Sequence, residues 1–426
     1  MNFSHLAPES FYRASSPGNA GHALQGPQEA AVCIIGGGFA GLATALSLVE
    51  AGQRNIIILE SETIGHGASG LNGGFVFGGF SLGERALVAQ VGPVKARQLY
   101  QLTLAAVAKI RSRIAKYNIA CDAIESGIYL ANWFDDPTLL DEQEKFMRET
   151  MGVQWQRVSK SDLAQKLHSE RYFGALFEEN AFHFHPLKYA QGLARVLREH
   201  GVRIYEHSRV QSLAKEGVDW RITTAQGSVR ATQTVVCCGG YIEKLYPKLA
   251  SAILPIATYV MATEPLGERL AQAMQTKSAV YDTRFAFDYY RPLPDSRLLW
   301  GGRISILRRS PQQVAKLLYG DMLKVYPQLA GVKVEHAWCG MMSYGRHKMP
   351  QLGQLPEGLW YAMGFGGHGV GPTTMAGEVI AQALMGNVQD VQAFAPWGLP
   401  STGGPAGLLA AQLTYWYYEL RDWLKE

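Results

Sequence analysis

Apolar residues along the chain follow two spacings, which alternate from one end to the other. Short, wholly apolar runs predict buried strands, and the clearest are Val32–Ile35 and Ile56–Leu59. Apolar residues three or four positions apart predict helices, and the longest such stretch runs from about Glu84 to Lys116. Further strands are expected at 124–131, 203–205, 234–237 and 359–363, and further helices at 189–200 and from about 372. Alternating strands and helices are typical of an α/β fold with a parallel sheet.

A second pattern occupies the middle of the chain. Residues 255–334 are rich in strand-forming residues, and Tyr289–Pro292 and Arg297–Arg303 form two such runs around the turn residues Pro294–Ser296. This arrangement predicts a hairpin in an antiparallel sheet. We therefore expect a second, α+β domain built on that sheet.

The turn after the first predicted strand is rich in glycine. The strand ends in Gly36-Gly37-Gly38-Phe39-Ala40-Gly41, a helix follows, and the next strand ends at Glu60. In a Rossmann-like unit the first glycine permits the tight turn, the second lets backbone approach a pyrophosphate, and the third lets helix and strand pack closely. Glu60 is placed to accept hydrogen bonds from a ribose, which favours FAD or NAD over NADP. A glycine turn that binds nothing is the alternative, and the flanking strand, helix and acid argue against it.

Length and these motifs together predict a division into discontinuous domains. An N-terminal arm covers 1–28, and the Rossmann-like FAD-binding domain covers 29–110, 180–254 and 338–426. The substrate domain covers 111–179 and 255–337.

Charge and cysteine content exclude several classes of protein. The 426 residues carry a formal net charge of +4 without a long Lys/Arg run, so nucleic-acid binding is not expected. The five cysteines lack the spacing of a disulfide framework or a zinc site, and no metal site is expected, including at His183 and His185. The N-terminus does not have the pattern of a signal peptide, and a reducing cytoplasm is the simplest location.

The C-terminal segment 406–418 has aromatic residues at helical spacing. We expect a helix that closes the fold by docking on it, and an interfacial membrane helix is the alternative. No segment has the length of apolar sequence that a spanning helix needs.

Four segments, in order, resemble the glycine/D-amino-acid oxidase superfamily of FAD-dependent oxidoreductases. They are the N-terminal fold with Glu60, the loop 65–74, the strand 235–240 and the closing loop 364–370. Within the superfamily the chain is similar to the branch that contains γ-glutamylputrescine oxidoreductase, which shares the Gly-Ala-Ser-Gly-x-Asn-Gly-Gly, Tyr-Tyr-Arg and Gly-His-Gly elements. Most of that branch has an arginine where Leu71 stands, so any ionic contact of that arginine is in doubt here.

The resemblance and the glycine fingerprint together imply which residues bind FAD. The expected set is Gly36, Gly38, Phe39, Ala40, Gly41, Glu60, Ser61, Gly67, Ala68, Ser69, Asn72, Gly73, Gly74, Val210, Gly239, Gly366, Gly367, His368, Gly369 and Val370. The closing loop precedes a helix, so its N–H groups are expected to face the flavin N1–C2=O region. His368 is expected to lie beside the cofactor, mainly in a structural role.

The activity that the resemblance implies is oxidation of a C–N bond. Hydride leaves the α-carbon of a neutral amine for flavin N5, and the imine is hydrolysed. We expect substrate contacts from the second domain, with Tyr290 and Arg291 as the preferred catalytic pair and His368 beside them. The other candidates for this wall are Phe285, Phe287, Tyr289, Trp300, Arg284 and Arg303.

Some questions stay open from sequence. The substrate favoured by the resemblance is of the γ-glutamylputrescine type, and the alternative is a D-amino acid or pipecolate. The lysine that sarcosine-oxidase relatives place over the flavin is not found, so either O₂ or a quinone could accept the electrons. FAD is expected to bind non-covalently, and a thioether bond to Cys339 is the lesser alternative. A more remote alternative for the whole protein is an NAD-dependent or non-enzymatic Rossmann protein.

Overall fold

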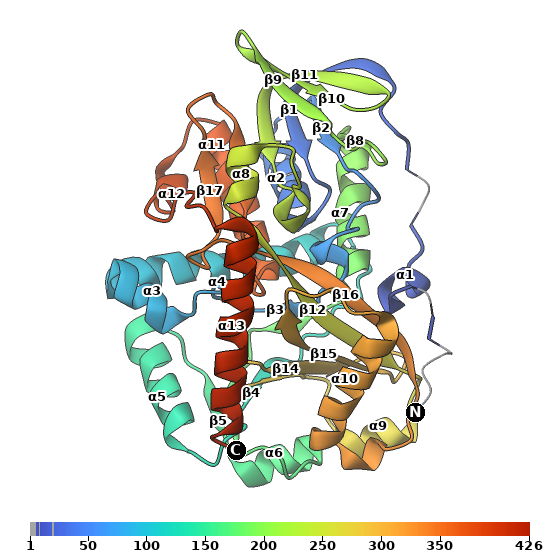
Figure 1. Cartoon of the computed structure of the whole chain (residues 1–426), viewed down its shortest axis with the longest axis vertical. Helices are drawn as coiled ribbons and strands as arrows, with labels where there is room; N and C mark the ends of the chain where they lie inside the picture. Colours follow the sequence, from blue (N-terminus) through green and yellow to red (C-terminus); the bar gives the residue numbers. More distant parts are fainter. Residues whose placement is uncertain (1–5, 8, 19–20) are drawn as a thin grey trace.

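The computed structural model describes residues 6–7, 9–18 and 21–426, and it contains two large sheets, one above the other in Figure 1. The upper, nucleotide-type sheet has the order β17-β18-β11-β1-β2-β8, and the hairpin of β9 and β10 continues from β11. Its strands are β1 (Gly26–Ile35), β2 (Ile56–Leu59), β8 (Arg203–Tyr205), β9 (Ser212–Glu216), β10 (Asp219–Thr223), β11 (Gly227–Val236), β17 (Gln351–Gln354) and β18 (Trp360–Met363). The strands β18, β11, β1, β2 and β8 run parallel, as predicted from the strand and helix alternation.

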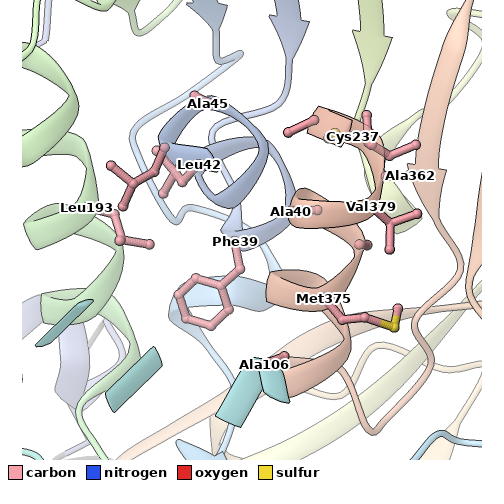
Figure 2. Close-up of a cluster of buried hydrophobic side chains, with 14 of the residues drawn as sticks. Phe39, Ala40, Leu42, Ala45, Ala106, Leu193, Cys237, Ala362, Met375 and Val379 are labelled. Carbon is pink, nitrogen blue, oxygen red and sulfur yellow. The ribbon is translucent and has the colours of Figure 1, made fainter. Parts of the chain in front are cut away.

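Helices cover this sheet because its central strands are apolar on both faces. The main ones are α2 (Phe39–Glu50), α4 (Pro93–Lys116), α7 (Pro186–Glu199) and α11 (Val370–Leu384). Figure 2 shows Phe39 and Leu42 of α2 packed among residues of these helices. This core fixes the start of α2, where the glycine turn lies.

The lower sheet has the order β16-β12-β15-β14-β13-β4-β6-β5. Its strands are β4 (Ile128–Ala131), β5 (Gln156–Val158), β6 (Ala175–Glu178), β12 (Leu254–Thr263), β13 (Ala279–Asp282), β14 (Asp288–Pro292), β15 (Leu298–Ser305) and β16 (Val334–Tyr344). Every pair is antiparallel except β13 with β4. The predicted hairpin is confirmed as β14 and β15. Strand β16 continues past the predicted domain boundary at residue 338, so residues 338–344 belong to this sheet.

Shorter elements complete the structure. Helices around the lower sheet are α5 (Thr138–Phe146), α6 (Lys160–Leu167), α9 (Glu268–Ala273) and α10 (Pro311–Val325). The remaining ones are β3 (Phe75–Val76), β7 (Phe182–His183), α8 (Pro247–Ser251) and α12 (Gln389–Gln392), the single-turn helices Ala68–Gly70, Gly239–Tyr241 and Pro327–Leu329, and the π-helix Met147–Met151.

The predicted helix from Glu84 to Lys116 is two helices. Helix α3 (Glu84–Val91) ends at Gly92, which has φ +78°, and α4 starts at Pro93. Glycine in the left-handed region ends a helix and proline begins one. The period of apolar residues continues across this break, which is why periodicity alone did not reveal it.

The N-terminal arm is partly a docked element. Residues 1–5, 8 and 19–20 of the predicted arm lie outside the described residues. Helix α1 (Phe11–Ser15) is capped by Ser10 and buries Tyr12 completely, with the Tyr12 ring 5.3 Å from that of Trp338. The arm is therefore packed on the lower sheet through α1.

The C-terminal helix α13 (Gly404–Trp423) docks on the fold, as expected from its spacing (Figure 1). Its inner side holds Gln412, Tyr415 and Asp422, whereas large apolar side chains are exposed on its outer side. These are Leu409, Leu413, Trp416, Tyr417, Leu420 and Trp423. Within the described residues, no helix is long and apolar enough to cross a membrane.

Candidate functional site

A single large cavity connects the two sheets. Its volume is about 1660 Å³, and its walls come from both sheets and from α13. Ligand pockets are commonly about 300–1,000 Å³. The cavity therefore has room for a ligand larger than a typical small molecule.

At the upper end, the cavity is formed by the turn between β1 and α2. Gly36 has φ +115°, and a Cβ there would lie 2.8 Å from the carbonyl oxygen of Cys237. A Cβ on Gly41 would lie 2.0 Å from the carbonyl oxygen of Gly36. Gly38, Phe39 and Ala40 line the cavity at the N-terminus of α2, where the helix dipole favours an anion.

Glu60 lies in the cavity wall directly after β2. Its carboxylate accepts the N–H of Gly37 at 2.7 Å and the N–H of Glu62 at 3.0 Å. The Ser61 hydroxyl also donates to it at 3.1 Å. These bonds fix the carboxylate beside the glycine turn, and Val210 lines the same part of the cavity.

The loop 65–74 is held in shape by its own polar side chains. The Ser69 hydroxyl accepts the N–H of Phe39 at 2.9 Å, which joins this loop to the start of α2. Asn72 donates to the carbonyls of Ala68 and Ser69 at 3.0 Å and accepts the N–H of Gly74 at 2.8 Å. The loop thus presents backbone and small side chains to the cavity.

The closing loop 364–369 leads from β18 into α11 along another wall of the cavity. The N–H of Gly366 donates to the carbonyl of Ser343 at 2.7 Å, and that of His368 donates to the Ser81 hydroxyl at 3.0 Å. Burial lowers the pKa of His368 to about 4, so its imidazole is neutral at pH 7. The ring centre lies 4.1 Å from that of Phe77.

The structure brings the predicted cofactor residues together. Every one of them lines the cavity except Gly41, which lies beneath the turn and packs α2 against β1, the role expected of the third glycine.

Tyr290 and Arg291 do not reach the cavity, contrary to the expected substrate contact. Tyr290 is 0% exposed and stacks on Trp300, with ring centres 4.3 Å apart. Successive side chains of a strand point to opposite faces, and on β14 it is Tyr289 that lines the cavity. Of the other candidates for this wall, Phe285, Phe287, Arg284 and Arg303 also line it, whereas Trp300 does not.

Arg291 instead supports the loop 65–74, which is expected to bind the cofactor. Its guanidinium is 1% exposed and donates to the carbonyl of Gly73 at 2.7 Å. It also donates to the carbonyl of Phe184 at 2.9 Å and to the Tyr12 hydroxyl at 3.1 Å. Arg291 therefore connects β14, the loop 65–74 and α1.

Sequence reasoning missed the acidic and aromatic residues at the lower end of the cavity. Glu84, Tyr100, Trp155 and Tyr281 line it there, from four separate segments. The local signal was a glycine-containing segment, Gly78, Gly79 and Gly83, directly before Glu84.

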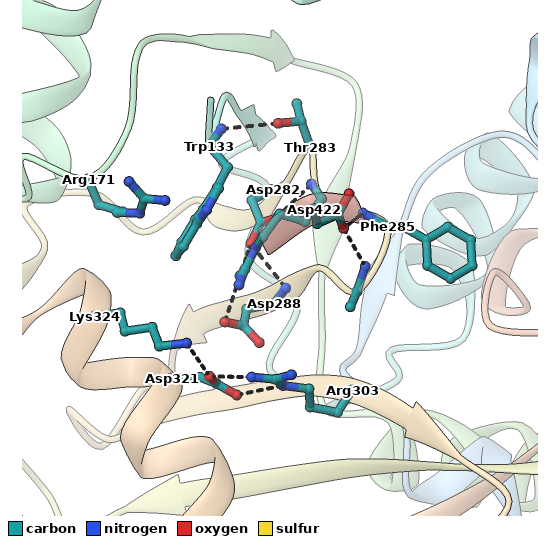
Figure 3. A network of polar contacts seen from close by, with 12 residues as sticks. Trp133, Arg171, Asp282, Thr283, Phe285, Asp288, Arg303, Asp321, Lys324 and Asp422 are labelled. Atoms are coloured by element: carbon teal, nitrogen blue, oxygen red, sulfur yellow. Dashed lines mark hydrogen bonds and ion pairs between the residues drawn. The ribbon is translucent and has the colours of Figure 1, made fainter. Parts of the chain in front are cut away.

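An ion-pair network fixes the segment 282–288 of the cavity wall (Figure 3). Arg284 bonds Asp282 at 2.6 Å and Asp288 at 2.8 Å, and its guanidinium lies 3.6 Å from the centre of the Trp133 ring. Asp422 of α13 accepts the N–H of Phe285 at 2.7 Å. The C-terminal helix thus stabilises this wall.

The cysteines and histidines do not form a second centre in the described part of the chain. Its five cysteines are all unpaired, and no cluster of His, Cys, Asp or Glu there could hold a metal ion. Cys339 lies on β16 but does not line the cavity, and burial raises the pKa of its thiol.

The upper end of the cavity fits FAD. It combines a helix N-terminus for the pyrophosphate, a carboxylate beside the glycine turn for a ribose, and positions where a Cβ would fill the space or strike backbone. Gly38 illustrates this, since a Cβ there would lie 2.9 Å from the Ser69 hydroxyl.

Comparison with known proteins agrees with this geometry. The family described as FAD dependent oxidoreductase (DAO) matches residues 31–383. The chain is 36% identical over 397 residues to the γ-glutamylputrescine oxidoreductase of Escherichia coli, covering 92% of both chains. It is 34% identical to the probable oxidoreductase OrdL of Haemophilus influenzae, covering 93% of this chain and 92% of that protein.

Among solved structures, the glycine oxidase of Geobacillus kaustophilus has a similar fold, with a TM-score of 0.73 at 21% identity, over 88% of this chain and 99% of that one. The family match covers most of the chain and includes the glycine turn, Glu60 and the closing loop. The chain belongs to the DAO family of FAD-dependent oxidoreductases.

Proposed function

We propose that this oxidoreductase oxidises the C–N bond of an amine of the γ-glutamylputrescine type. The observation that carries the proposal is the large cavity, in which the residues suited to FAD are continuous with a chamber walled by aromatic side chains. The 36% identity to the Escherichia coli enzyme along 92% of the chain supports the substrate class.

The chemistry that FAD supplies when bound is acceptance of two electrons from the carbon next to the amine nitrogen. Residues of the upper sheet would hold it: the N-terminus of α2 at the pyrophosphate, Glu60 at a ribose, and the loop 65–74 along the ring system. The closing loop and the N-terminus of α11 would place positive dipoles beside the ring, which favour the negative charge that reduction brings.

The chain's own residues then have positioning roles. Tyr289 and Phe287 line the cavity as an apolar wall that would orient the α-carbon. His368, neutral at pH 7, can donate or accept a hydrogen bond at the cofactor side of this chamber. Arg291 keeps the loop 65–74 in place without touching substrate.

Non-covalent binding of FAD belongs to the same proposal. Cys339 does not line the cavity, and its raised thiol pKa leaves little of the nucleophilic thiolate. Since the described cysteines are all unpaired, we also propose the reducing cytoplasm as the location.

A D-amino acid or pipecolate dehydrogenase is the second candidate, because it would use the same cofactor cradle with a different chamber. Either O₂ or a quinone would serve as acceptor in both cases. The two candidates differ in the substrate that reduces the flavin, so one experiment distinguishes them.

The test is anaerobic bleaching of the flavin absorbance by γ-glutamylputrescine, free polyamines, L-pipecolate, sarcosine and D-amino acids. We expect rapid bleaching by γ-glutamylputrescine and slow or no bleaching by the amino acids. Admitting air afterwards identifies the acceptor, since fast recolouring indicates O₂ and slow recolouring a dehydrogenase. Bleaching by amino acids alone would overturn the proposed substrate.

A further inference from the structure

The C-terminal helix α13 contacts the rest of the molecule largely through polar side chains. Gln412 accepts the N–H of Ile306 at 3.0 Å and the hydroxyl of Ser305 at 3.0 Å. Asp422 accepts the N–H of Phe285 at 2.7 Å. A helix on the surface of a protein usually turns its apolar side inward and its polar side to solvent. In α13 the polar side chains are the ones turned inward.

The outward side of α13 is apolar, and in Figure 1 this helix runs along the front of the molecule. Seven large side chains on it and at its C-cap are 54–71% exposed, and they are Leu409, Leu413, Trp416, Tyr417, Leu420, Trp423 and Leu424. From residue 404 to residue 418 the helix has no charged residue. The outward side therefore forms a long apolar face that no other described element covers.

The area of this apolar face is larger than a monomer usually exposes. Large side chains present about 150–250 Å² each when fully exposed, so seven that are more than half exposed present roughly 800 Å². The largest apolar patch of a typical monomer is about 300–600 Å². Each partner in a standard protein–protein interface contributes about 800 Å². The face therefore has the size that one half of a stable dimer interface needs.

The spacing of these side chains is typical of helices that pair with each other. Five of them follow at intervals of four, three, four and three residues, and we call this set the α13 seam: Leu409, Leu413, Trp416, Leu420 and Trp423. Apolar residues at this 3.5-residue repeat lie along one line of a helix and insert between the side chains of a facing helix. The seam therefore fits a second helix with the same spacing.

A membrane surface fits this face less well than a helix does. Helices that lie on membranes carry Lys and Arg on their polar side, and these cations attract anionic lipids. Helix α13 has one cation, Arg421, against the two acids Glu419 and Asp422. The guanidinium of Arg421 lies 4.6 Å from the centre of the Tyr418 ring. The charges of this helix therefore provide no attraction to an anionic membrane.

We propose that α13 pairs with α13 of a second copy of this chain, seam against seam, in a two-fold symmetric dimer. Each copy brings the same apolar line, so the contact is complementary to itself. Trp416 lies at the middle of the seam, and buried tryptophans near the centre of an interface supply much of its binding energy. The proposal does not depend on which amine the enzyme oxidises.

The same helix connects this dimer contact to the cavity. Gln412 and Tyr415, on the buried side of α13, line the cavity, and Asp422 holds the N–H of Phe285 in the cavity wall. A second copy packed on the outward side would hold α13 against that wall without adding a residue to the cavity. Dimer formation would thus stabilise the chamber that the C-terminal helix closes.

Sedimentation velocity of the full-chain holoenzyme tests the proposal. At about 10 µM we expect wild type at twice the chain mass of 46.8 kDa. Leu413→Glu places a charge in the seam and should weaken the dimer at least about tenfold. Val94→Glu, at an exposed apolar side chain in the first turn of α4, is the matched control and should leave the dimer unchanged. Wild type that stays monomeric at about 100 µM, or a dimer that Leu413→Glu does not weaken, would overturn the proposal.

A second measurement uses wild type alone and so decides the matter even if Leu413→Glu fails to fold. Hydrogen exchange is compared above and below the concentration at which the dimer dissociates. We expect peptides within 404–423 to exchange severalfold faster in the dilute sample, while peptides of α11 stay unchanged. Equal exchange of the α13 peptides at both concentrations would overturn the pairing. Binding of monomers to vesicles of phosphatidylcholine and phosphatidylglycerol, lost in Leu413→Glu, would also overturn it and assign the face to lipid.

Discussion

The two ends of the cavity are built in different ways. The upper end presents mainly backbone and glycines, together with the carboxylate of Glu60, from segments that follow strands of a parallel sheet. The lower end presents large side chains from helices, strands and loops that are distant in sequence. The first kind of site depends on the path of the chain, and the second depends on which face of each element turns inward.

The largest effect is expected from a change in backbone packing at the upper end. Gly41→Val would push a side chain into the carbonyl of Gly36, which lies 2.0 Å from the Cβ position. We expect at least a tenfold loss of flavin per chain, or no folded protein, measured by the absorbance ratio and circular dichroism. Gly320→Ala in α10 is the control, because a Cβ there meets nothing within 4 Å. Full flavin content in Gly41→Val would contradict the assigned packing role.

At the lower end, the next largest effect is expected from breaking the network of Figure 3. Arg284→Met leaves Asp282 and Asp288 buried without their cation. Removing one partner of a buried pair costs about 3–5 kcal/mol, so the free energy of unfolding should fall by this amount. Arg111→Met, which breaks the exposed pair with Glu125, should cost under about 1 kcal/mol. Equal costs in denaturant titrations would show that the network does not hold the wall.

A pH titration of stability should reveal the buried acid of the lower end. Glu178 has its pKa raised from 4.5 to about 8, so the folded state binds its proton more tightly than the unfolded state does. The contribution of Glu178 to the free energy of unfolding is complete below pH 4.5. It falls by about 1.4 kcal/mol per pH unit as pH rises toward 8. The free energy of unfolding of Glu178→Gln should lack this pH-dependent slope, whereas that of the wild type should show it. Parallel stability curves between pH 5 and 8 would be inconsistent with the raised pKa.

The smallest effects distinguish two adjacent tyrosines. Tyr290→Phe removes a hydroxyl that lies 3.3 Å from that of Tyr326, and we expect a loss of about 1 kcal/mol of stability with unchanged kinetics. Tyr289→Leu, at the cavity wall, should instead change KM or kcat severalfold while FAD stays bound. Steady-state kinetics and thermal melts on both variants check this, and the reverse pattern would restore Tyr290 as the substrate contact.

The sequence was a good guide to the upper end because its requirements are local. A glycine at a turn, an acid at a strand end and a glycine loop before a helix each occupy a few consecutive residues, and the structure brings them together. The parallel sheet followed from the alternation of apolar strand runs with helical segments.

The lower end could not be predicted as well, for physical reasons. Period-two alternation says that Tyr289 and Tyr290 face opposite ways, but not which of them faces the cavity. Glu84 and Glu178 are 94 positions apart in numbering, and only the fold brings them close enough for the charge of Glu84 to raise the pKa of Glu178. The helix break at Gly92 was missed because the prediction followed the apolar spacing, although Gly92-Pro93 is itself a helix-breaking pair.

The cofactor cradle joins segments that are distant in the sequence. Gly36 and Glu60 are translated well before the closing loop at 364–369. At about 5–20 residues per second, roughly 15–60 s separate Glu60 from that loop on the ribosome. The complete cradle therefore cannot form on a growing chain until the closing loop has been translated, and its upper-sheet segments must wait that long without the last part of their binding site.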